Sequence, residues 1–91
     1  KKKTLSQILR KLNIKKKFEL LNIDVEGHEY HVLKGLNFND FQPSVITVEI
    51  HVKKTKEIFE TPIYKILKKN KFELISHYYQ TSFFKHEDLN I

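Results

Sequence analysis

Acidic and imidazole side chains cluster directly after a mostly apolar stretch in the first third of this 91-residue chain. The segment reads Ile23-Asp24-Val25-Glu26-Gly27-His28-Glu29, and it follows the run that begins at Phe18. A carboxylate or an imidazole can accept a proton from a substrate hydroxyl or amine. The same groups can hold a divalent cation or hydrogen-bond a sugar-like ligand. The residue types therefore predict one of these three chemistries.

A second group of such residues, Glu49 and His51, ends the β-branched run of residues 44–51. Side chains two apart on a strand share a face and lie roughly 6.6 Å apart along it. In open α/β sheets, ligands bind beyond the carboxyl ends of the strands, so both groups are expected at one pocket rim. The residues predicted to handle protons are Asp24, Glu26, His28 and Glu49, and those predicted to bind substrate are Glu29 and His51. A rim metal site built from Asp24, Glu26, His28, Glu49 and His51 is the alternative.

The elements that must position these residues follow from apolar spacing and from turn and cap residues. They are a helix at Leu5–Leu12, strands at Phe18–Val25 and Ser44–His51, a short helix from His28, a helix ending near Lys69, and strands at Phe72–Tyr79 and Ser82–His86. Thr4 and Gln7 have the spacing of a capping box, and Thr61-Pro62 is typical of an N-cap and first helical position. Alternation of strands and helices predicts an α/β fold with parallel strands. The last two strands are too close for a crossover, so they are expected to form an antiparallel hairpin. A polar, lysine-rich loop is expected after His51.

Composition narrows the class of protein. The formal net charge of +6 is compatible with an anionic partner, although lysine-rich usage also fits a simple composition bias. The absence of cysteine is compatible with a reducing cytoplasm. No apolar run approaches the roughly 20 residues that span a bilayer. Because the chain starts with lysine and contains no methionine, we expect it to be part of a longer protein.

The segment from Ile23 to Glu29, followed by Val32-Leu33-Lys34-Gly35-Leu36, resembles the signature of FkbM-type methyltransferases. The stretches around Thr4-Leu5, from Pro43 to Glu49 and from Phe72 onward resemble further parts of that family in the same order. The resemblance implies that residues 1–91 form a single partial domain. That domain would be the C-terminal half of a Rossmann-like class I methyltransferase sheet, with three parallel strands plus a terminal antiparallel hairpin strand, flanked by helices. The resemblance also implies that this last strand is inserted between the second and third of the parallel strands.

The resemblance also implies transfer of a methyl group from S-adenosylmethionine to a hydroxyl of a glycan or natural product, with Asp24 and Glu26 near the acceptor. The chain has only two glycines, Gly27 and Gly35, so it lacks a glycine-rich nucleotide loop. The main cofactor site is therefore expected upstream, and the chain alone is expected to be inactive. An uncovered edge of the first strand predicts self-association. The alternative function is a small basic module that binds nucleic acid or an anionic surface.

Overall fold

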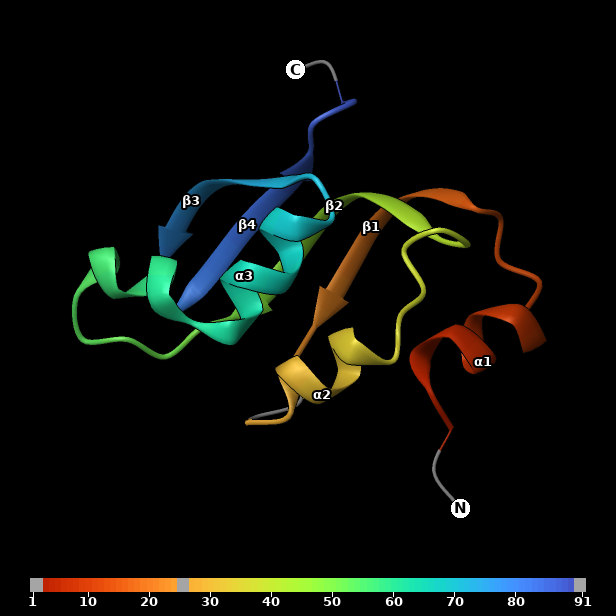
Figure 1. The fold of residues 1–91 in the computed structure, drawn as a ribbon, viewed down its shortest axis with the longest axis horizontal. Helices are drawn as coiled ribbons and strands as arrows, with labels where there is room; N and C mark the ends of the chain where they lie inside the picture. The colour runs from red at the N-terminus through yellow and green to blue at the C-terminus, as the bar shows by residue number, and fades with distance from the viewer. Residues whose placement is uncertain (1–2, 25–26, 90–91) are drawn as a thin grey trace.

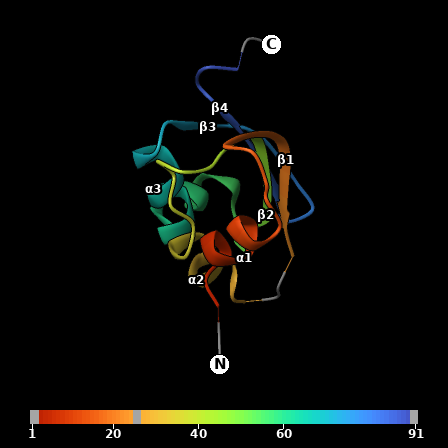
Figure 2. The same cartoon turned by 90° about the vertical axis from the view of Figure 1, so that its right-hand side faces the viewer.

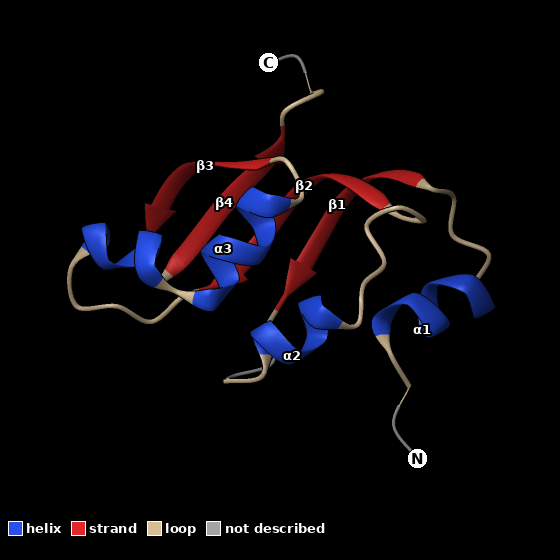
Figure 3. Cartoon of the chain, viewed as in Figure 1, coloured by secondary structure: helices blue, strands red, loops and turns tan. Residues whose placement is uncertain are grey.

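The computed structural model describes residues 3–24 and 27–89, and Figures 1 and 3 show the course of the chain. In this part of the chain, helices alternate with strands before a closing hairpin. The elements are α1 (Leu5–Lys11), β1 (Lys17–Ile23), α2 (Glu29–Lys34), β2 (Gln42–Glu49), the 3₁₀ helix η1 (Thr55–Glu60), α3 (Pro62–Lys69), β3 (Phe72–Tyr78) and β4 (Thr81–His86). The α/β class is therefore as predicted.

The strands form one mixed sheet in the order β1-β2-β4-β3. β1 and β2 are parallel, and Ile23 pairs with Val48 near their carboxyl ends. β4 lies between β2 and β3 and is antiparallel to both. The expectation of three parallel strands plus a hairpin strand is met only in part, because β1 and β2 are the only adjacent strands of the described sheet that run parallel. β4 separates β3 from the other two, so the last, antiparallel strand lies between the two strands before it, as the resemblance implies.

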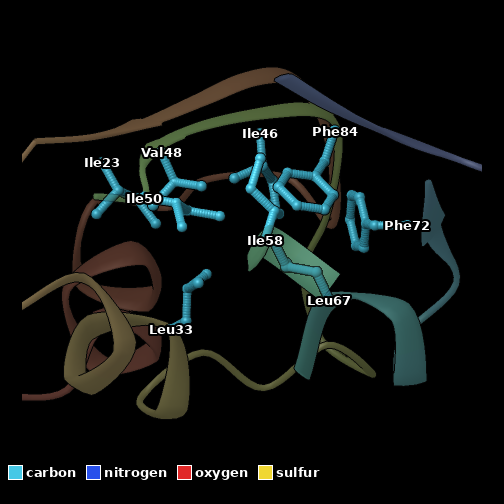
Figure 4. Close-up of a cluster of buried hydrophobic side chains, with 9 residues drawn as sticks. All are labelled: Ile23, Leu33, Ile46, Val48, Ile50, Ile58, Leu67, Phe72 and Phe84. Carbon is cyan, nitrogen blue, oxygen red and sulfur yellow. The ribbon is translucent and has the colours of Figure 1, made fainter. Parts of the chain in front are cut away.

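The helices cover one face of the sheet, as the two perpendicular views show (Figures 1 and 2). The main core lies between the two layers and is built from strand residues such as Ile46 and Phe84 against helix residues such as Leu33 and Leu67 (Figure 4). All four of these side chains are buried. The opposite face of the sheet carries Leu20, which is 56% exposed.

Local signals in the sequence explain where two of the helices begin. The Thr4 hydroxyl accepts a hydrogen bond from the Gln7 backbone N–H at 3.1 Å, and the Gln7 side chain accepts from the Thr4 N–H at 2.9 Å. This reciprocal pair is the predicted capping box. At α3, Thr61 caps the helix and Pro62 occupies its first turn, also as predicted.

The ends of the first two strands differ most from the prediction. β1 ends at Ile23, so Asp24 follows the strand instead of lying within it. β2 spans Gln42–Glu49, so it begins earlier than predicted and leaves His51 outside. Pro43 fits there because it precedes Val45, the first β2 residue in the register with β4, and so lies at the strand start. The lysine-rich loop contains η1, which buries Ile58 completely in the core.

Candidate active site

The carboxyl ends of β1 and β2 lie side by side at one edge of the sheet. Ile23 of β1 pairs with Val48 of β2, and Asp24 and Glu49 are the residues that follow them in the chain. Asp24 is exposed and Glu49 is partly exposed. The predicted meeting of acidic residues from two strands at one rim is therefore consistent with the strand register, although Asp24 stands just beyond its strand.

Glu49 and His51 form a side-chain pair at this rim. Glu49 Oε1 and His51 Nε2 lie 3.0 Å apart. When Nε2 carries the ring proton it donates to the carboxylate, and Nδ1 is then an acceptor. The His51 side chain is 63% exposed and that of Glu49 30%, so a ligand can reach the pair from solvent. A carboxylate that orients an imidazole in this way prepares the ring to accept a proton.

The backbone on both sides of His51 is held by the β3–β4 turn. The Ile50 N–H donates to the Gln80 carbonyl at 2.8 Å. The Val52 N–H donates to the Gln80 side-chain oxygen at 3.0 Å. Gln80 is therefore a positioning residue for His51. The sequence did not indicate this role, because it predicted only a turn between two strands at this point.

Gly27 and Glu29 form a compact turn between β1 and α2. Gly27 has φ +87°, a conformation that L side chains rarely adopt, which explains glycine at this point. Its N–H donates to Glu29 Oε1 at 3.0 Å. Glu29 is only 3% exposed, and its Oε2 has no hydrogen-bond partner among the described residues. Glu29, predicted to bind substrate, thus contributes one carboxylate oxygen to fixing the turn.

The remaining predicted residues differ in position. His28 is exposed and immediately precedes α2, with its ring centroid 6.3 Å from that of His31. Glu26 lies outside the described residues. Within residues 3–24 and 27–89, no three His, Asp or Glu side chains lie in an arrangement that would hold a metal ion. The carboxylate of Glu49 and the imidazole of His51 in the described rim can accept protons and form hydrogen bonds with a ligand.

The two glycines do not form a nucleoside cradle. A Cβ on Gly35 would lie 3.1 Å from the Leu5 backbone nitrogen, so this glycine serves the close packing of α1 on α2. Gly27 is an isolated glycine in a turn, and acidic residues lie next to it in the sequence. Neither Gly27 nor Gly35 therefore takes part in a glycine-rich nucleotide loop of the G-x-G type.

Comparison with known proteins gives one match. Residues 1–86 match the family described as "Methyltransferase FkbM domain". No curated protein and no solved structure matches the chain. In the described part of the chain, none of the helices has the length and apolar character needed to cross a membrane.

Proposed function

Because the chain belongs to the FkbM methyltransferase family, we propose that it provides the acceptor-binding and proton-handling side of an S-adenosylmethionine-dependent O-methyltransferase. The acceptor is a hydroxyl on a glycan or natural product. The observation that carries this proposal is the hydrogen-bonded Glu49–His51 pair at the rim where Asp24 follows β1. A cytoplasmic location is part of the proposal.

The chemistry of this chain is deprotonation of the acceptor hydroxyl. S-adenosylmethionine supplies the methyl group when it is bound. Asp24 is the first candidate to take or polarise the hydroxyl proton, and Glu26 is the second. The Glu49–His51 pair contributes an oriented imidazole that hydrogen-bonds the acceptor. Placing the hydroxyl correctly accounts for much of the rate enhancement in such a reaction.

We propose further that this chain is inactive without the segment that binds the cofactor. The support is that Gly35 is needed for the close packing of α1 on α2 and Gly27 for a turn. The chain has no other glycine that could form a nucleotide loop. Mixing this chain with labelled S-adenosylmethionine and acceptor should give no methyl transfer, whereas the full-length gene product should be active.

The decisive experiment measures methyl transfer by the full-length gene product carrying Asp24→Asn. Asparagine keeps the size and hydrogen-bonding capacity of the side chain but is not a base. The kcat should fall about 100-fold with little change in KM, since general bases contribute about 10²–10⁴-fold. Glu60→Gln, at an exposed position on η1, is the matched control and should leave kcat unchanged. Unchanged rates for both Asp24→Asn and Glu26→Gln would refute the assignment.

A groove between α2 and α3 favours the alternative, binding of an anionic partner. It has a volume of about 440 Å³ and is lined by Tyr30 with three lysines, Lys34, Lys65 and Lys69. Binding of a generic DNA duplex that weakens steeply with salt, and weakens further in Lys65→Gln, would support this function. Absent or salt-independent binding would exclude it.

A further inference from the structure

Two exposed tyrosines occupy the tip of the β3–β4 hairpin. Tyr78 is 68% exposed and Tyr79 is 83% exposed, and their ring centroids lie 4.5 Å apart. Among the described residues, the next most exposed phenylalanine or tyrosine is Phe59, at 51%. Tyrosine has an apolar ring and a polar tip, which suits it to binding surfaces. The hairpin tip therefore presents two adjoining aromatic rings to solvent.

The backbone of Tyr79 is in a conformation that does not favour tyrosine. Its φ is +49°, and a left-handed conformation costs free energy for a residue with a Cβ. Asparagine or glycine would form the same turn at a lower cost. Tyr79 gains no burial in return. Residues held in unfavourable conformations are concentrated at ligand-binding and active sites, so this tyrosine points to a binding role.

The tyrosines lie at the same edge of the sheet as the candidate active site. β4 is antiparallel to both β2 and β3, so β3 runs in the direction of β2, and the β1 and β3 arrows both point downward in Figure 1. Thr81 pairs with Glu49 on one side and with Tyr78 on the other. These three residues therefore share one face of the sheet. Since neighbouring strands are 4.7–4.9 Å apart, the backbones of Glu49 and Tyr78 are roughly 10 Å apart.

The hairpin tip is also bonded to the segment that carries His51. Gln80, the residue after Tyr79, accepts hydrogen bonds from the N–H groups of Ile50 and Val52 at 2.8 and 3.0 Å. The connection between the tyrosines and His51 thus consists of two hydrogen bonds between described residues. A ligand that packs on the tyrosine rings is held beside the Glu49–His51 pair.

We propose that Tyr78 and Tyr79 form a stacking site for a sugar ring of the methyl acceptor. The inference rests on the proposed methyltransferase function and narrows its acceptor to a glycan. A sugar ring has a face of C–H groups that can pack on an aromatic ring, and its hydroxyls hydrogen-bond to polar side chains. The partly exposed Thr81 and the Glu49–His51 pair supply such side chains next to the rings. A hydrocarbon or flat aromatic acceptor lacks the hydroxyls that these groups can bind.

The test starts from the full-length gene product on an array of immobilised glycans with labelled S-adenosylmethionine. The glycan that receives most label is then the probe for kinetics in solution. Tyr79→Asn and Tyr78→Thr remove one ring each, and asparagine and threonine suit the turn and the strand at these positions. We expect each variant to raise KM about tenfold with little change in kcat, because loss of an apolar contact in a binding site weakens binding about 10–200-fold.

Lys71→Asn is the matched control. Lys71 has φ +72° and precedes β3, so this substitution relieves the same kind of backbone conformation at the opposite end of the strand. Its KM should equal that of the original protein. Thermal unfolding of the full-length gene product should show a higher Tm for both Lys71→Asn and Tyr79→Asn. A lower Tm for Tyr79→Asn would show that the fold covers this ring, which would overturn the proposal.

The other outcomes separate the proposal from the proposed function. Methyl transfer with the same KM in the tyrosine variants and in Lys71→Asn would overturn the stacking site and leave the methyltransferase function intact. Methyl transfer to hydroxylated molecules that contain no sugar, with no label on any glycan, would do the same. Glycan binding that the tyrosine variants weaken, without methyl transfer by the original protein, would uphold the stacking site and contradict the proposed function.

Discussion

The side-chain oxygen of Gln80 accepts a hydrogen bond from the Val52 backbone N–H, 3.0 Å away. The carbonyl of the same Gln80 accepts from Ile50 at 2.8 Å. These two bonds flank His51 and connect it to the tip of a hairpin about 30 residues further along the chain. The geometry of the rim therefore depends on the β3–β4 turn as well as on the strand ends.

Replacing Gln80 tests this dependence. Gln80→Leu removes the oxygen that accepts from Val52, and we expect a loss of about 1 kcal/mol in the free energy of unfolding. Gln80→Glu keeps an acceptor oxygen and should remain close to the original stability. Urea unfolding measures both values, and hydrogen exchange should show faster exchange of the Val52 amide only in the leucine variant. Equal exchange rates would contradict the positioning role.

Glu29 should be important for stability although it lies next to the proposed site. Glu29→Leu leaves the Gly27 N–H without its acceptor, and we expect a loss of about 0.5–1.5 kcal/mol in the free energy of unfolding, because the exposed Gly27 N–H can bond to water instead. Glu29→Gln retains an oxygen for that bond and should cost less. Glu60→Leu is the control, because Glu60 is exposed. A leucine variant at position 29 as stable as the control would show that the bond is dispensable.

Replacing Gly27 by a residue with a Cβ is predicted to lower the stability of the chain. The only cause is the backbone conformation at this position. Nothing lies within 4 Å of the position that a Cβ would take, but φ is +87°. Gly27→Ala should therefore cost about 1–2 kcal/mol, the usual penalty of a left-handed conformation. Gly27→Asn should cost less, because asparagine tolerates positive φ better. Thermal unfolding distinguishes the two, and equal stability of both with the original chain would refute this explanation.

A substitution at Tyr79 in the β3–β4 turn is predicted to stabilise the fold. Tyr79 and Gln80 have φ +49° and +66°, and they join strands that are paired at Tyr78 and Thr81. Two-residue turns with positive φ at both positions favour asparagine followed by glycine. Tyr79→Asn should raise the free energy of unfolding by about 0.5–1 kcal/mol, part of the penalty of a left-handed residue.

The matched contrast at this turn is Gln80→Gly. It relieves the same kind of conformational penalty but removes the hydrogen bond to Val52, so it should gain less than Tyr79→Asn. A gain from Gln80→Gly equal to the full left-handed penalty of about 1–2 kcal/mol would mean that the bond to Val52 contributes nothing.

The free edge of β1 is predicted to cause self-association. β1 is the terminal strand of the sheet, and Leu20 on it is 56% exposed. Exposed edge strands with apolar residues pair with other chains, and lysine on the edge suppresses such pairing. The 91-residue chain should show concentration-dependent association in analytical ultracentrifugation, reduced by Leu20→Lys. Leu12→Lys, also at an exposed leucine but on the helical side, should have no effect.

Sequence signals of short range predicted much of the fold. The Thr4–Gln7 capping box and the Thr61-Pro62 start of α3 depend only on neighbouring residues, and both were correct. The apolar runs also located β1 and β2, and hence the rim. The strand ends were less accurate, because the polar residues after a strand do not show where hydrogen bonding between strands stops.

Features that depend on distant contacts could not be predicted. The 3₁₀ helix η1 forms where Ile58 is buried in the core, although it lies in a segment that the sequence marked as a polar, lysine-rich loop. The role of Gln80 depends on its side-chain contact with Val52, which lies 28 residues away in the chain. The sequence placed Glu29 among the candidate substrate-binding residues. Its burial and its hydrogen bond to Gly27 arise only in the folded turn, so the sequence did not indicate them.

The uncovered face of the sheet also carries side chains that form a hydrogen bond. On it, the Thr47 hydroxyl donates to the Asn22 side-chain oxygen at 2.5 Å, across the paired strands β1 and β2 and close to Leu20. A purely hydrocarbon layer placed over this face would remove water from the Asn22 amide and the Thr47 hydroxyl. This costs free energy unless both groups form new hydrogen bonds. We therefore expect a layer that covers this face to bind more strongly when it brings a polar group to the Asn22–Thr47 pair than when it is purely apolar.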